Sequence, residues 1–175
     1  MSAHVFVDES KSRGFLLAAS VVPAPDLASL RRAVDALRLP GQRRIHFTSE
    51  RDDRRRLILA ALLDAGPAVV IYQAPQECPI TRARDLTMAR LADDAIRLGA
   101  ARIVVERDDQ AVHSDRRIIR ERAELAGRHD SLRYVHLRAH EECLLAVPDA
   151  VAWCWAKGGD WRRRVAPLVA RAVQL

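Results

Sequence analysis

The order of short apolar segments along the chain restricts its fold more than any other feature. Five runs rich in aliphatic residues have the length of strands, and segments with helical spacing of apolar residues separate most of them. The expected strands cover residues 5–7, 15–22, 68–72, 102–106 and 132–137. Only a short turn separates the first two strands, so we expect them to form a hairpin.

Helical segments account for the rest of the chain. Two helices are expected between the second and third strands, one over residues 82–98 and another over 114–127. From Glu141 onward the chain is predicted to be helical around Pro148, and a final helix is expected after the glycine pair at 158–159.

This order of elements is that of a ribonuclease H-like fold. The predicted fold class is α/β: a mixed five-stranded sheet flanked by helices, with a helical insertion between the second and third strands. Since no repeat, linker or low-complexity segment divides the sequence, residues 1–175 are expected to form a single ribonuclease H-like domain.

Composition and cysteine use favour a globular cytoplasmic protein. Apolar residues make up 49% of the chain, and no apolar run approaches the roughly 20 residues that cross a bilayer. No membrane partner is therefore expected, and because Asp8 comes too early for the core of a signal peptide, the protein is expected to stay in the cytoplasm. Because Cys78, Cys143 and Cys154 form no C-x-x-C pair, we expect buried free thiols and neither a disulfide framework nor a zinc site.

The charge of the chain allows a nucleic-acid partner. The net charge is +6, and all of the 29 basic residues except Lys11 and Lys157 are arginine. Arginine binds phosphate through two parallel hydrogen bonds, which suits DNA or RNA; the sequence does not distinguish the two. Genomic composition and solvated helix faces explain the same bias equally well.

Three carboxylates stand where a ribonuclease H-like fold would bring them together. Asp8 ends the first strand, Glu106 ends the fourth, and Asp149 lies early in a late helix. The first and fourth strands of such a sheet are neighbours, and the late helix packs beside them. Converging carboxylates repel each other, and a hard divalent cation such as Mg²⁺ or Mn²⁺ relieves that repulsion. Asp8, Glu106 and Asp149 are therefore the candidate catalytic and metal-binding residues. Each also has a purely structural interpretation, at a turn, a strand end or a helix start.

Two further residues are candidates for binding substrate. His46 precedes a helix, where it would contact a phosphate group, and Arg107 directly follows Glu106. His46 as an ordinary turn residue is the alternative.

Four short segments resemble the domain-of-unknown-function 3800 family. Asp8-Glu9-Ser10 resembles the opening motif of that family, and residues 44–47 are similar to a segment there that contains histidine. Residues 104–107 fit its acidic fourth strand, and residues 145–153 resemble its late segment with aspartate. The similarity spans nearly the whole chain. It implies a ribonuclease H-like fold with Asp8, Glu106 and Asp149 as the metal carboxylates.

Two functions remain open from the sequence. The first is a Mg²⁺- or Mn²⁺-dependent nuclease, or a related phosphodiester-processing enzyme, with the three-carboxylate site. The alternative is a non-catalytic module of the same fold that binds nucleic acid or protein. Pro148 motivates the alternative, because it departs from the family pattern beside Asp149.

Overall fold

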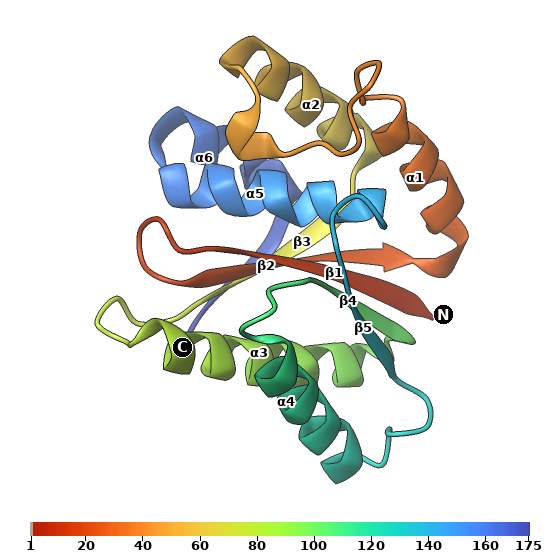
Figure 1. Ribbon diagram of the computed structural model, residues 1–175, viewed down its shortest axis with the longest axis vertical. Helices are drawn as coiled ribbons and strands as arrows, with labels where there is room; N and C mark the ends of the chain where they lie inside the picture. The colour runs from red at the N-terminus through yellow and green to blue at the C-terminus, as the bar shows by residue number, and fades with distance from the viewer. Residues whose placement is uncertain (1) are drawn as a thin grey trace.

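The computed structural model describes residues 2–175, in which helices cover both faces of one sheet (Figure 1). The strands are β1 (Ala3–Ser10), β2 (Leu16–Pro23), β3 (Ala68–Gln73), β4 (Arg102–Glu106), β5 (Arg133–Leu137) and β6 (Val169–Gln174). The α-helices are α1 (Leu27–Asp35), α2 (Asp52–Ala65), α3 (Ile80–Leu98), α4 (Val112–Leu125), α5 (Ala146–Lys157) and α6 (Gly159–Val165). Short 3-10 helices are η1 (Ala24–Asp26), η2 (Phe47–Ser49), η3 (Cys143–Leu145) and η4 (Ala166–Leu168).

The sheet is mixed, with the strand order β5-β4-β1-β2-β3-β6. β2 pairs antiparallel with both β1 and β3, so the first three strands form a meander. β4 pairs parallel with β1 on one side and with β5 on the other. The first and fourth strands are therefore neighbours, as the predicted fold class requires.

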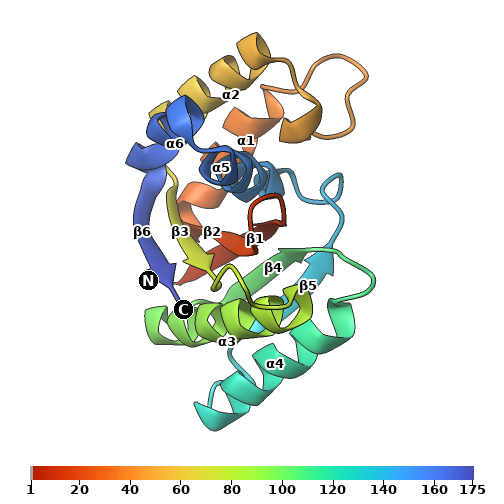
Figure 2. The same ribbon diagram turned by 90° about the vertical axis from the view of Figure 1, so that its left-hand side faces the viewer.

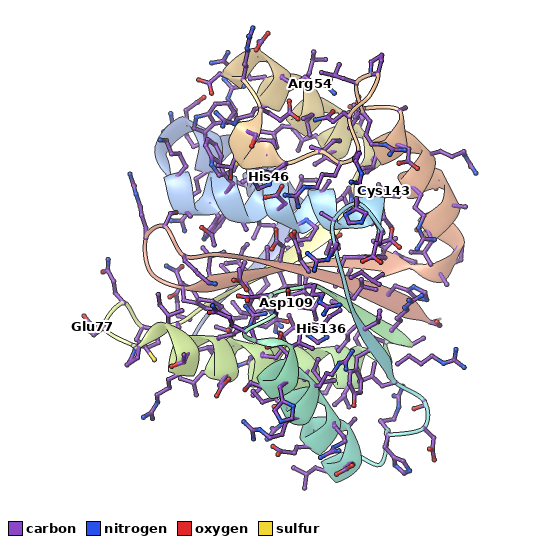
Figure 3. All side chains as sticks on the ribbon, in the orientation of Figure 1. His46, Arg54, Glu77, Asp109, His136 and Cys143 are labelled. Carbon is purple, nitrogen blue, oxygen red and sulfur yellow. The ribbon has the colours of Figure 1, made fainter. Side chains whose placement is uncertain are left out.

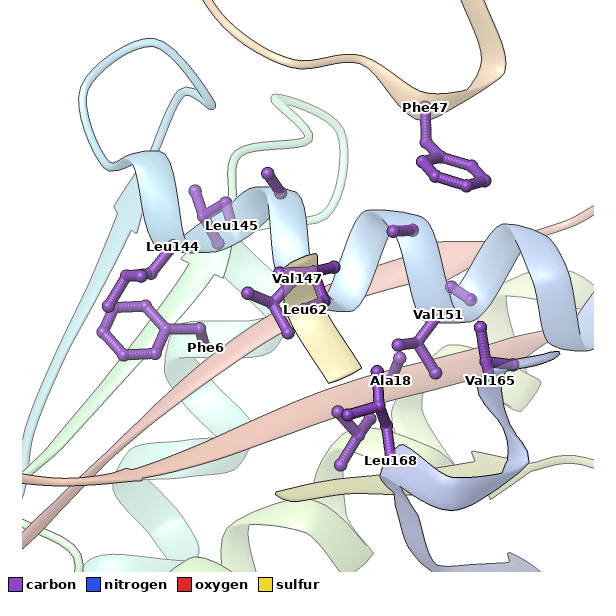
Figure 4. Packing of buried hydrophobic residues seen from close by; sticks show 14 of the residues in the cluster. Phe6, Ala18, Phe47, Leu62, Leu144, Leu145, Val147, Val151, Val165 and Leu168 are labelled. Atoms are coloured by element: carbon purple, nitrogen blue, oxygen red, sulfur yellow. The ribbon is translucent and has the colours of Figure 1, made fainter. Parts of the chain in front are cut away.

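Alternating side chains of β1 separate two hydrophobic cores. Val5 and Val7 belong to the core beneath α3 and α4, whereas Phe6 belongs to the core beneath α5. Val104 of β4 faces the same side as Phe6. α5 is buried on both sides, because the strands lie beneath it and Phe47 covers its other side (Figure 4).

The prediction of five strands is wrong, because residues 2–175 form a six-stranded sheet, whereas the helix predicted after the glycine pair at 158–159 is present as α6. α6 exists, but the chain passes Pro167 in η4 and then forms β6. β6 pairs parallel with β3 at the sheet edge (Figure 2). Proline cannot continue the hydrogen bonding of a helix, which explains why the helix stops there. The pairing with β3 is a tertiary contact that local periodicity does not report.

Within residues 2–175, no helix is both long and apolar enough to cross a membrane. Cys78, Cys143 and Cys154 are free thiols. Only Cys154 is fully buried, so the prediction that all three are buried is wrong for the other two.

Candidate carboxylate site

Two of the candidate carboxylates end neighbouring parallel strands. Phe6 of β1 lies beside Val104 of β4, and both side chains face α5. Because strand side chains alternate, Asp8 and Glu106, each two residues further on, also point to the α5 side. This shared register is what brings together two residues that are far apart in the sequence.

The third carboxylate comes from the first turn of α5. One Asp149 carboxylate oxygen accepts a hydrogen bond of 2.9 Å from the backbone N–H of Phe47. The same oxygen lies 3.7 Å from Nδ1 of His46. Pro148 is buried in the same turn, where proline is compatible with a helix, and Asp149 still reaches the site.

These side chains line one open hollow of about 540 Å³, here called the carboxylate hollow. Figure 3 labels His46 on the α5 side and Asp109 near the end of β4. The residues that line the carboxylate hollow are Asp8, Glu9, His46, Thr48, Glu106, Arg107, Asp108, Asp109, Gln110 and Asp149. All five candidate residues from the sequence are thus in one place.

Asp8 lies in the least favourable electrostatic position of the three acids. Burial raises the pKa of Asp8 well above its usual range, and the nearby carboxylates of Glu106 and Asp149 raise it further. Arg84 opposes this only in part. The Asp8 carboxylate accepts the N–H of Glu9 at 2.7 Å, and within residues 2–175 it has no arginine or lysine partner within ion-pair distance.

The neighbouring carboxylate also raises the pKa of His46, but here it favours the charged form of the side chain. The Asp149 carboxylate raises the pKa of His46, because it stabilises the protonated ring, although partial burial opposes the shift. An imidazolium at this position would face the opening of the carboxylate hollow.

The other acids already have partners. Arg44 lies 3.2 Å from a Glu106 oxygen, a contact that the sequence did not predict although Arg44 lies two residues before His46. Arg107 donates to Asp109 at 2.6 Å, so its guanidinium is engaged within the wall of the hollow.

The donor set suits a hard divalent cation in type and charge. The candidate ligands are carboxylate oxygens, and within residues 2–175 Asp8 has no cationic partner at ion-pair distance, so its ionised form would gain from a bound cation. Among residues 2–175, however, no three His, Cys, Asp or Glu side chains are arranged closely enough to hold an ion as they stand. Within residues 2–175, Arg44 and the Phe47 N–H each contact a single oxygen of Glu106 and of Asp149, which leaves the second oxygen of each carboxylate for an ion shared with Asp8.

A buried ionic network supports the site from the other face of the sheet. Glu9 follows Asp8 in β1 and therefore points toward α3, where it pairs with Arg84. Arg84 also forms two hydrogen bonds to Asp115, of 2.9 and 2.8 Å. Asp115 is in turn 3.0 Å from Nε2 of His136. The sequence analysis did not predict this network. The sequence signal that could have indicated it is Arg84, which helical spacing places on the core-facing side of α3.

Comparisons with known proteins relate the chain to others through its fold alone. No family model matches the chain, and no curated protein matches its sequence. Among solved structures, it is similar to an RNase HII in complex with PCNA from Archaeoglobus fulgidus, with 13% sequence identity and a TM-score of 0.56. The match covers 95% of this chain and 76% of that chain.

The fold is ribonuclease H-like. At 13% identity the similarity establishes the architecture alone.

Proposed function

We propose that this protein is a divalent-metal-dependent nuclease. One observation carries the proposal: Asp8, Glu106 and Asp149 open into a single hollow, where Asp8 remains without a cationic partner. Carboxylates in this arrangement are costly unless a cation joins them, and this cost is a feature of functional sites. The fold similarity to an RNase HII agrees with this assignment.

Asp8, Glu106 and Asp149 would hold Mg²⁺ or Mn²⁺, which would activate water and stabilise the leaving oxygen of a phosphodiester. His46 lies beside Asp149, where its ring would donate a hydrogen bond to a phosphate oxygen. Arg55 donates to the backbone carbonyls of Phe47 and Thr48 at 2.9 and 2.7 Å and so fixes the segment that carries His46. Arg107 donates to Asp109 through Nε, and its terminal guanidinium nitrogens would contribute to substrate binding.

The test is a cleavage assay with labelled single-stranded and duplex DNA and RNA, in the presence of Mg²⁺, Mn²⁺ or EDTA. We expect metal-dependent cleavage that is lost in Asp8→Asn. Glu77→Gln is the matched control, because Glu77 is exposed in the loop before α3, away from the carboxylate hollow, and it should keep full activity. Cleavage that persists in EDTA, or in Asp8→Asn, would contradict the proposal.

A specific observation favours a second function, a non-catalytic nucleic-acid-binding module. Glu106 and Asp149 already have partners, and no trio of potential ligands within residues 2–175 is arranged around an ion. Calorimetric titration with Mn²⁺ separates the two functions. Heat of binding that disappears in Asp8→Asn supports the nuclease, whereas no binding at millimolar Mn²⁺, with oligonucleotide binding retained, supports the module.

A further inference from the structure

One face of α5 leads away from the carboxylate hollow. Asp149, Trp153 and Lys157 follow each other at intervals of four residues, so they lie on the same side of the helix. The Trp153 ring is 5.4 Å from the Phe47 ring, whose backbone N–H binds Asp149, and 5.5 Å from the Trp161 ring of α6. A half-buried aromatic pair, Trp153 and Trp161, therefore continues directly from the hollow.

Cations surround this aromatic pair. The Arg55 guanidinium lies 4.3 Å from the Trp153 ring, but its donors are already bound to Phe47, Thr48 and Asp52. Lys157 is exposed, with Nζ 5.9 Å from the Trp153 ring.

Two more exposed cations come from other elements. Arg56 of α2 lies 5.7 Å from the Trp161 ring. Arg13, in the turn between β1 and β2, reaches the end of α5: a Cβ atom placed on Gly158 would lie 3.6 Å from its guanidinium. Arg13, Arg56, Trp153, Lys157 and Trp161 together are here called the α5 strip.

Among residues 2–175, the cations of the α5 strip have no carboxylate partners. Two of the nearby acids are already paired, Asp52 with Arg55 and Asp160 with Arg163 and Arg164, and Asp53, three residues before Arg56 on α2, makes no ion pair within residues 2–175. Within residues 2–175, Arg13, Arg56 and Lys157 make no ion pair at all. Their charge is therefore available to an external anion, and the aromatic faces beneath Arg56 and Lys157 favour a cation at those positions.

The carboxylate hollow has the opposite character. Five acids besides Asp8 line it, together with His46 and Arg107. The cations that approach these acids from outside the lining are taken up by ion pairs: Arg44 with Glu106, Arg84 with Glu9, and Lys11 with Glu9 and Asp108. A polyanion would gain little affinity there unless a metal ion were bound, so its affinity has to come from a neighbouring basic surface. The α5 strip adjoins the hollow through Asp149 and has the required charge.

We propose that the α5 strip binds the phosphodiester backbone of a nucleic-acid strand that runs out of the carboxylate hollow. This inference rests on the function proposed for the hollow and names the surface that holds its substrate. Arginine and lysine on a phosphate backbone supply affinity without sequence preference, so DNA and RNA should both bind.

The test measures binding without catalysis. Full-length protein carrying Asp8→Asn, in EDTA, is titrated into a fluorescein-labelled strand of about 20 nucleotides, as DNA, as RNA and as duplex, with anisotropy as the signal. Arg13→Glu, Arg56→Glu and Lys157→Glu should each weaken binding by about three- to tenfold, and each should reduce the salt slope by about 0.7 to 0.9. The matched controls are Arg82→Glu, Arg116→Glu and Arg133→Glu, which are also exposed and outside any ion pair within residues 2–175, but lie on α3, α4 and β5. They should bind as the parent does.

Tryptophan fluorescence gives a second measurement. The chain contains three tryptophans. In Trp155→Phe, the two remaining indoles belong to the α5 strip, and the oligonucleotide should quench them. In the double variant Trp153→Phe with Trp161→Phe, only Trp155 remains, and quenching should be lost.

Each result has a defined meaning. The proposal for the α5 strip would be overturned if the strip variants and the control variants weakened binding equally. It would also be overturned if the protein bound anionic lipid vesicles more tightly than the oligonucleotide. If Asp8→Asn abolishes cleavage while the strip variants bind normally, the nuclease function is supported and the role of the α5 strip in binding nucleic acid is contradicted. If the strip variants bind weakly but no metal supports cleavage, the role of the α5 strip in binding nucleic acid is supported and the nuclease function is contradicted.

Discussion

The Asp149 carboxylate accepts the backbone N–H of Phe47 at 2.9 Å, across a separation of 102 residues. This hydrogen bond fixes the η2 segment on α5 and places His46 at the edge of the carboxylate hollow. A residue proposed to bind metal is thus also a structural acceptor.

The first prediction separates these two roles of Asp149. Asp149→Ala leaves the Phe47 N–H without its acceptor, and an unsatisfied buried donor costs about 1–3 kcal/mol. Asp149→Asn keeps an acceptor oxygen and removes the charge that repels Asp8. We therefore expect Asp149→Ala to unfold at lower urea concentration than Asp149→Asn, with Glu77→Ala as an unaffected control. Equal midpoints for the two Asp149 variants would show that the hydrogen bond does not contribute.

The second prediction concerns Arg84, which is buried between Glu9 and Asp115. Arg84→Met should lower the free energy of unfolding by about 3–5 kcal/mol, because it leaves the buried Asp115 carboxylate unpaired. Arg82→Met, on the exposed side of the same helix, should change it by less than about 0.5 kcal/mol. Adding Asp115→Leu to Arg84→Met should recover part of the loss. A further decrease in the double variant would argue against the unpaired charge as the cause.

The third prediction is a loss of stability in acid. Burial opposes the charge on Asp115, but hydrogen bonds from Arg84 and His136 outweigh it and lower the pKa of Asp115. A carboxyl with a lowered pKa in the folded state stabilises the protein above its unfolded-state pKa, and this contribution is lost as the pH falls through the folded-state value. Carbon-13 NMR titration of the folded protein should show the Asp115 midpoint below the usual range for aspartate. A midpoint at or above that range would contradict the prediction.

The fourth prediction concerns Asp8, whose pKa is raised by burial and by Glu106 and Asp149. The effect of pH on the free energy of unfolding is therefore opposite to that of Asp115. Protonated Asp8 is compatible with the folded state, and this contribution to stability is lost as the pH rises through the raised folded-state pKa. In metal-free protein at neutral pH, Asp8→Asn should therefore be more stable than the parent, and the difference should shrink in acid. Urea unfolding in EDTA at several pH values checks this; a less stable Asp8→Asn at neutral pH would contradict it.

Millimolar Mn²⁺ should stabilise the parent and leave Asp8→Asn unchanged.

Much of the candidate site could be predicted because it depends on local periodicity and on one feature of the fold, in which the first and fourth strands are neighbours. The β-branched run of β4 ends at Glu106 as β1 approaches its end at Asp8, and strand alternation puts both on one face once the two strands are neighbours. The early position of Asp149 in α5 also follows from local signals. The partners of these acids did not follow, because Arg44 and Phe47 approach through a loop whose path has no periodic signal.

Local sequence patterns were enough to predict the first five strands, the helices between them and the strand-end positions of Asp8 and Glu106, because hydrophobic periodicity is a property of residues that are close in sequence. Three features could be seen only in the folded chain: residues 169–174 form β6, Arg84 is buried against Glu9 and Asp115, and cations that make no ion pair within residues 2–175 lie beside Trp153 and Trp161. Each of these depends on the energy of contact with a distant segment. Pairing with β3 outweighs the helical preference of residues 169–174. The contacts with Glu9 and Asp115 outweigh the preference of the Arg84 charge for water.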